Sequence, residues 1–342
     1  MARERLHGSL STVEYFTFGF GTMIGVGWLV LMDDWLTRGG PAGGILGFLV
    51  GGLLLFPIAH TYGRLVQRIQ DAGAEIAYTE GVMPASISFA AGWTMVLSYA
   101  IVCPWEAVAT GNLLARVFPA LNSFQLYAIG GSAIYAALVA GFLFYVLIIA
   151  VVTYVYPWQE IVSGHVRTEV AFERTFGSHR IAQLILFGAF LSLLKIFNGN
   201  FVAATRMLYA IGRRNLVHPS LGRVHASYGT PVVAISLMAA LTAAAAMFGD
   251  AILVPITEVG SLAVGVGWLS ACVAYLLRRR DNPEDTAASP AMAWIGCAVS
   301  IAIVLMKVVP SVPGSFTRPE WIAFAAWSAA GLVFWLLRPR RV

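Results

Sequence analysis

Long apolar runs constrain this chain more than any other feature. A helix needs about 20 mostly apolar residues to cross a bilayer, and only helices or closed barrels satisfy their own backbone hydrogen bonds in lipid. The runs show no period-two alternation, which excludes a barrel. The sequence therefore predicts an all-α integral membrane protein with nine spans, at 13–37, 41–66, 84–117, 126–156, 181–211, 230–248, 252–277, 290–309 and 320–337.

The composition agrees with a chain whose main solvent is lipid. Hydrophobic residues make up 58% of the 342 residues and charged residues 11%, whereas soluble proteins carry about 25% charged residues. The net charge of +5 does not indicate nucleic acid, because the basic residues lie in short clusters such as Arg278–Arg280 and form no continuous basic face. We therefore expect the lipid bilayer as a partner, and no nucleic acid.

The sequence lacks the motifs of common enzyme and metal sites. It contains no GxSxG, HExxH or phosphate-binding loop, and its six histidines show no metal-ligand spacing. Cys103, Cys272 and Cys297 lie in apolar runs without short spacing, so we interpret them as small buried side chains rather than a disulfide framework or zinc site. We expect no enzymatic activity, no cofactor and no metal.

Positive charge in short loops predicts which span ends face the cytoplasm. The segments rich in Lys and Arg are the N-terminus (Arg3, Arg5), the loop at Arg64 and Arg68, the loop at Arg206–Arg223, the triplet at 278–280 and the tail at 338–341. The predicted sides conflict at one point. The span 84–117 should end outside, whereas the loop at Arg213 should lie inside. That passage needs an odd number of crossings, but the sequence offers two apolar runs. Either one run fails to cross, or one end of the protein is inverted relative to its charges.

The first span contains three glycines within seven residues, namely Gly21, Thr22, Met23, Ile24, Gly25, Val26 and Gly27. Each glycine costs a helix about 1 kcal/mol relative to alanine, so this stretch favours a break in mid-membrane. A break leaves free N–H groups that can hold a carboxylate and free carbonyls that can hold an ammonium group or a cation. Amino acids carry both groups, so the stretch is a candidate substrate site. A close-packed glycine face between helices is the alternative.

Three motifs together resemble one transporter family, the amino acid–polyamine–organocation superfamily of permeases. The glycine stretch is similar to its first-helix signature, Arg206–Pro231 to the cytoplasmic loop after its eighth helix, and Asp71–Glu75 with Ala91-Gly92-Trp93 to the start of its third helix. The resemblance covers most of the chain. It implies a leucine-transporter-like bundle of five-plus-five inverted repeats, a midplane substrate site, alternating access, and coupling to protons or sodium.

The chain departs from this family in one large block. Residues 1–135 resemble helices one to three and the start of four, whereas 136–342 resemble helices seven to twelve. Most of helix four, with five and six, would then be absent from a single transmembrane domain over 1–342, and the inverted-repeat bundle would be incomplete. Three lost crossings would account for the conflict in sidedness. Helix six would be the second broken helix, so half the substrate site would be lost.

Charged residues inside apolar runs are the candidates for ion coupling. A charge at the bilayer centre costs at least about 2.5–3.5 kcal/mol, and Lys195 lies in such a run. The resemblance implies that its helix faces the break in the first, where a lysine could mimic a cation or carry the coupled proton, with Ser192 sharing the site. Glu106 could relay a proton. The alternatives are a snorkelling or structurally paired lysine and a neutral or paired structural carboxylate.

These observations predict a secondary-active permease for an amino acid or related organic cation, in the plasma or inner membrane with a cytoplasmic N-terminus. It would not transport if the absent block is real. The alternative is a non-transporting binding or regulatory membrane protein that pairs with a full-length permease. A homo-oligomer is also compatible with the sequence.

Overall fold

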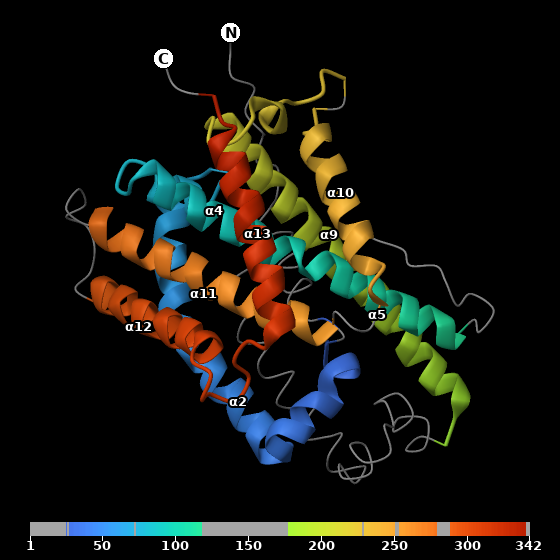
Figure 1. The fold of residues 1–342 in the computed structure, drawn as a ribbon. Helices are drawn as coiled ribbons and strands as arrows, with labels where there is room; N and C mark the ends of the chain where they lie inside the picture. The colour runs from blue at the N-terminus through green and yellow to red at the C-terminus, as the bar shows by residue number, and fades with distance from the viewer. Residues whose placement is uncertain are drawn as a thin grey trace.

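The computed structural model describes residues 25, 27–71, 73–117, 177–227, 229–249, 253–278 and 288–339. The named elements in these ranges are all helices, which confirms the predicted all-α architecture (Figure 1). In chain order they are α2 (Gly27–Arg68), α3 (Glu75–Thr79), α4 (Ala85–Ala100), α5 (Val102–Val117), α9 (His179–Arg213), η2 (Pro219–Gly222), α10 (Val232–Ala246), α11 (Leu253–Arg278), α12 (Ala288–Val308) and α13 (Arg318–Leu336).

Six helical stretches of the described chain are long and apolar enough to cross a membrane. They confirm the predicted spans at 41–66, 84–117, 181–211, 252–277, 290–309 and 320–337. The first predicted span is described only from Gly27 onward, apart from Gly25, and the run 126–156 lies outside the described residues.

The predicted span at 230–248 is corrected to a shorter helix. The helix α10 has 15 residues, which extend about 22 Å at 1.5 Å per residue, less than the roughly 30 Å of hydrocarbon. It begins only after Pro231, and the chain turns at Gly249 with a φ of 58°. The prediction rested on the length of the apolar run alone and did not allow for Pro231 and Gly249, which limit the helix at its two ends.

A backbone break divides α2 into the two segments that the sequence predicts. Gly40 has a φ of 59° and a ψ of −175°, a conformation outside the helical region. Glycine adopts a positive φ at low cost because it has no Cβ, and the Pro41 that follows suits the first turn of a new helix. The two apolar runs that end and begin here are thus separate helical segments.

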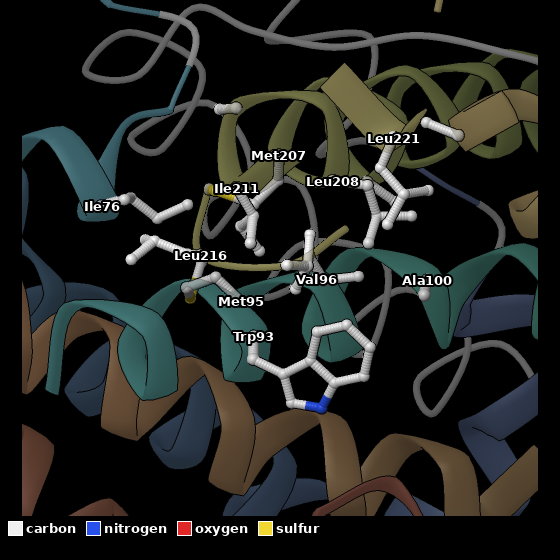
Figure 2. Close-up of a cluster of buried hydrophobic side chains, with 14 of the residues drawn as sticks. Ile76, Trp93, Met95, Val96, Ala100, Met207, Leu208, Ile211, Leu216 and Leu221 are labelled. Carbon is white, nitrogen blue, oxygen red and sulfur yellow. The ribbon is translucent and has the colours of Figure 1, made fainter. Parts of the chain in front are cut away.

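The helices α4 and α5 lie between two other groups of helices. The helix α4 packs against α9 on one side and α11 on the other, α5 packs along α9, and α12 packs along α11 and α2. The main core lies where α4 meets α9, with Val96, Met207 and Ile211 among its buried residues. Figure 2 shows these side chains interleaved, with Trp93 at the edge toward the other helices.

Tryptophan side chains join α13 to α4. The rings of Trp93 and Trp327 stack with their centroids 4.7 Å apart. Each indole Nε1–H donates to the other residue's backbone carbonyl, at 3.0 Å and 3.1 Å. Gly331 permits this approach, because a Cβ there would lie 2.4 Å from the Trp93 Nε1.

Two positively charged helix ends, those of α9 and α11, meet at the short helix α3. Arg278 at the end of α11 donates to the carbonyls of Tyr78 and Ala77 in α3, at 2.8 Å and 3.2 Å. Arg214, just after α9, forms ion pairs with Asp71 and Glu80 on either side of α3, at 3.0 Å and 2.8 Å. The short helix α3 is therefore held by the ends of two long helices that are remote in sequence.

The opposite side carries a smaller charged network. Glu258, near the start of α11, forms ion pairs with Arg38 in α2 at 3.1 Å and with Lys307 in α12. Lys307 also donates to the carbonyl of Gly314 at 3.2 Å. The network therefore ties α2 just before its break at Gly40, and the end of α12, to the start of α11 and to the connection before α13.

Candidate substrate and coupling site

The carboxyl group of Glu106 is buried in the middle of the bundle. It lies in α5, which follows α4 after the single residue Ile101, whose φ of −71° and ψ of −25° stay in the helical region. Pro104 has no N–H, so the carbonyl of Ala100 lacks its usual donor four residues later. The Glu106 residue is 4% exposed. The sequence thus removes one backbone hydrogen bond of a spanning helix beside an acidic side chain.

The structure brings Glu106 close to Lys195, the other charged candidate. Glu106 lies in α5 and Lys195 in α9, which pack against each other. The buried Cys103 thiol lies 4.0 Å from the Phe197 carbonyl oxygen. Lys195 is near the midpoint of α9, and its side chain is exposed. The sequence proposed both residues separately, and the packing of α5 on α9 makes them a pair.

Several buried polar atoms near this pair lack a hydrogen-bond partner among the described residues. They are Oε2 of Glu106, Nε1 of Trp105, Oδ1 of Asn198 and Oγ1 of Thr242. They come from α5, α9 and α10 and flank one apolar cluster, made up of Cys103, Ala107, Phe197 and Ala246 with Phe201 packed against it. An unpartnered buried polar group costs about 1–3 kcal/mol. The region therefore offers unused donors and acceptors to a proton, an ion, water or a polar ligand.

Sequence reasoning did not single out Trp105 or Thr242 as candidates for this region. Thr242 lies in an alanine-rich run, where a lone threonine most often bonds to the backbone of its own helix. Trp105 is one of ten tryptophans. Only the burial of their polar atoms distinguishes them, and burial of that kind is not visible in the sequence.

The proposed substrate stretch lies mostly outside the described residues. Gly21, Thr22, Met23, Ile24 and Val26 are not described, whereas Gly25 is buried and non-helical and α2 begins at Gly27. Ser192 lies in α9 one turn before Lys195 and is half-buried. The role of the glycine stretch and that of Ser192 stay predictions.

A second buried carboxyl group lies outside the spans, in α3. Glu75 is fully buried, and its Oε1 accepts a hydrogen bond of 2.8 Å from the Tyr62 hydroxyl. Its Oε2 has no partner among the described residues. Burial raises the pKa of the Glu75 carboxyl above its ordinary value, although the bond from Tyr62 opposes that shift. This group belongs to the contact between α3 and α2 and is separate from the Glu106–Lys195 pair.

The fold defines the class of protein first: a multi-pass helical membrane protein with buried charges between its spans. Comparison with known sequences gives the family. A sequence profile described as "Amino acid permease" matches residues 131–335, and a second profile with the same description matches residues 15–140. The chain belongs to the amino acid permease family, a family of transporters rather than enzymes. This agrees with the resemblance found in the sequence motifs.

Individual relatives match parts of the chain. It is 27% identical over 119 residues to the amino-acid permease RocE of Bacillus subtilis, covering 35% of this chain and 26% of that protein. It is 33% identical over 107 residues to the glutamate/serine transporter AimA of the same organism, covering 31% and 20%. With the branched-chain amino acid permease BcaP, also of B. subtilis, the identity is 28% over 204 residues, covering 58% and 41%. The chain thus spans less than half the length of these relatives in each match.

Proposed function

We propose that this protein is a secondary-active permease for an amino acid or a related organic cation, with Glu106 and Lys195 as its coupling pair. Family membership supports the class of substrate. The observation that carries the coupling role is a buried carboxyl group with an unpartnered oxygen on α5, which packs on α9, where Lys195 lies near the helix midpoint. One proton moving onto or off such a pair changes the charge at mid-depth, which is what a proton-coupled cycle requires.

The energetic argument favours a working pair over a purely structural one. A buried carboxyl group with an unpartnered oxygen costs stability rather than adding to it. Ionisable residues within spans carry an insertion cost and commonly mark ion or proton pathways. Lys195 is exposed among the described residues, on α9. If sodium is the coupled ion, the carboxyl oxygens of Glu106 would bind it and Lys195 would take no part.

Transport by the purified chain in proteoliposomes tests the proposal. Uptake of radiolabelled amino acids and polyamines is measured with and without an inward proton or sodium gradient. We expect uptake that rises with the proton gradient in the wild type and that loses this dependence in Lys195→Met and Glu106→Gln. Lys307→Met serves as the matched control, because Lys307 also pairs with a glutamate but lies in the network at the other end.

Two results would count against the proposal. If Lys195→Met keeps the full gradient dependence, the lysine has no coupling role. If a double Glu106→Gln/Lys195→Met variant transports as well as the wild type, the pair is structural. Loss of uptake in the control as well would indicate a general loss of fold, which size-exclusion profiles of each variant check directly.

The second candidate is a non-transporting membrane protein that pairs with a full-length permease. It is favoured by the predicted absence of most of helix four together with helices five and six, and by the limited share of each relative that the chain covers. Copurification with a complete permease, combined with no uptake by the folded chain alone, would support it. Sequencing the gene region that encodes residues 130–140 from source DNA shows whether about three further spans belong there.

We also propose a plasma- or inner-membrane location with a cytoplasmic N-terminus. The gathering of Arg214 and Arg278 at one side supports this orientation through the positive-inside rule. Cysteine labelling from each side of the membrane at Arg3→Cys tests it, and labelling from outside would refute it.

A further inference from the structure

Two of the three cysteines lie against each other between α11 and α12. Cys272 in α11 and Cys297 in α12 belong to one apolar cluster, which also contains Ile58 of α2. Both are free thiols, and they are 0% and 5% exposed. The Sγ of Cys272 lies against Gly296, the residue next to Cys297 in α12. Their separation along the sequence hid this contact, because 24 residues lie between positions 272 and 297.

A glycine brings the two helices close at this point. A Cβ at Gly296 would lie 2.7 Å from the Sγ of Cys272, which is closer than real side chains approach, so only glycine leaves room for the thiol. The same helix pair closes again two turns away, where a Cβ at Gly265 would lie 3.1 Å from Ile303. A disulfide needs Cα atoms within roughly 4.4–6.8 Å, and small residues are what permit helices to approach that closely.

We propose that Cys272 and Cys297 form a buried dithiol pair that two-electron oxidants convert into a disulfide linking α11 to α12. Cys103, the third cysteine, is also buried but has no other cysteine beside it. It is 0% exposed, but its thiol faces backbone carbonyls, those of Tyr99 at 3.7 Å and Phe197 at 4.0 Å, and neither other cysteine belongs to its cluster. The site is therefore a pair and not a general property of buried cysteines.

The chemistry needs an oxidant of a stated class. With a membrane-permeant azo oxidant such as diamide, one thiol sulfur adds to the N=N bond. The second sulfur then displaces the resulting hydrazine, forming one S–S bond. Two S–H bonds are lost, and both electrons and both protons pass to the oxidant. Cys272 lies six residues before Arg278, which is about 9 Å along the helix, so a permeant reagent needs to enter only a short distance from the charged end.

The test is a thiol count on the purified full chain. The protein is treated with diamide in detergent micelles, quenched, denatured and labelled with a maleimide, and the intact mass is measured. We expect wild type to fall from three labelled cysteines to one, with the label remaining on Cys103, and we expect dithiothreitol to restore all three. Cys103→Ser should fall from two to none, whereas Cys272→Ser and Cys297→Ser should each keep both remaining thiols.

Peptide mapping then identifies the bond. A crosslinked peptide that joins residues 272 and 297 supports the proposal. Three labelled cysteines after treatment, under conditions that fully oxidise added glutathione, would overturn it. So would loss of a thiol at Cys297 alone, or an equal loss at Cys103. Cys272→Ala and Cys297→Ala repeat the test without a new hydroxyl group, so that a folding defect of one serine variant does not decide the outcome.

Discussion

Gly212 near the end of α9 offers a sharp test of the described packing. A Cβ at this position would lie 2.4 Å from the backbone nitrogen of Gly222 and 2.8 Å from the carbonyl carbon of Leu221. These are backbone atoms of η2 and its end, so no side chain can rotate away. Inserting a methyl group into such a site costs about 1–3 kcal/mol. We therefore expect Gly212→Ala to lower the free energy of unfolding by that amount.

The matched control is Gly188 in the same helix. A Cβ there meets nothing within 4 Å, so alanine gains helix propensity, worth up to about 1 kcal/mol, without a clash. The assay is the apparent midpoint of thermal unfolding in detergent, followed by tryptophan fluorescence at one scan rate, because membrane proteins commonly unfold irreversibly. We expect Gly212→Ala to melt several degrees below the wild type and Gly188→Ala at or above it. Equal midpoints for the two variants would refute the close approach of α9 and η2.

Three further predictions follow from single contacts. Trp327→Phe removes the donor to the Trp93 carbonyl and is expected to cost about 1 kcal/mol, measured by thermal unfolding, with no change in transport. Burial raises the pKa of Glu75, so its contribution to stability is fully present below its ordinary pKa and is lost as the pH rises through the raised value. Glu75→Gln should therefore weaken the fall of the unfolding midpoint with rising pH, and an unchanged pH profile would contradict the burial. Glu258→Gln leaves Lys307 without its carboxylate partner and should lower the midpoint at low salt, with a smaller effect at high salt.

The sequence predicted most of the fold because lipid imposes simple rules on a chain. The lengths of the apolar runs predicted the six long helical stretches, and the predicted boundary between 13–37 and 41–66 coincides with the break at Gly40 inside α2. The run at 230–248 was the exception. Its apolar length suggested a span, but Pro231 and the turn at Gly249 limit α10 to 15 residues. Apolar composition predicts well whether a segment lies in lipid. It predicts poorly at which residues the helix begins and ends.

The candidate site was only partly predictable. Glu106 and Lys195 each stand out as a charge inside an apolar run, and that cost is visible in the sequence. Their pairing depends on how α5 and α9 are placed against each other, which no periodicity in either helix specifies. The thiols of Cys272 and Cys297 show the same limit. Contacts between segments distant in sequence arise from packing, and packing depends on small residues such as Gly296 whose role is unclear until the neighbouring helix is in place.

Helix packing and charge both bear on the sidedness conflict. A Cβ at Gly92 in α4 would lie 3.7 Å from the Ile211 side chain, and Cys103 in α5 lies near Phe197 in α9. Moving along α4 and α5 from Gly92 to Cys103, the contacts on α9 move back from Ile211 to Phe197. The helices α4 and α5 therefore run antiparallel to α9. The end of α5 and the start of α9 then lie toward the same side, which is what the positive charges near Arg213 require. The two profile matches of the permease family also meet within residues 131–140. The helix packing and the charge pattern thus agree on the direction of α9 relative to α4 and α5, and the departure from the longer relatives between α5 and α9 stays a prediction.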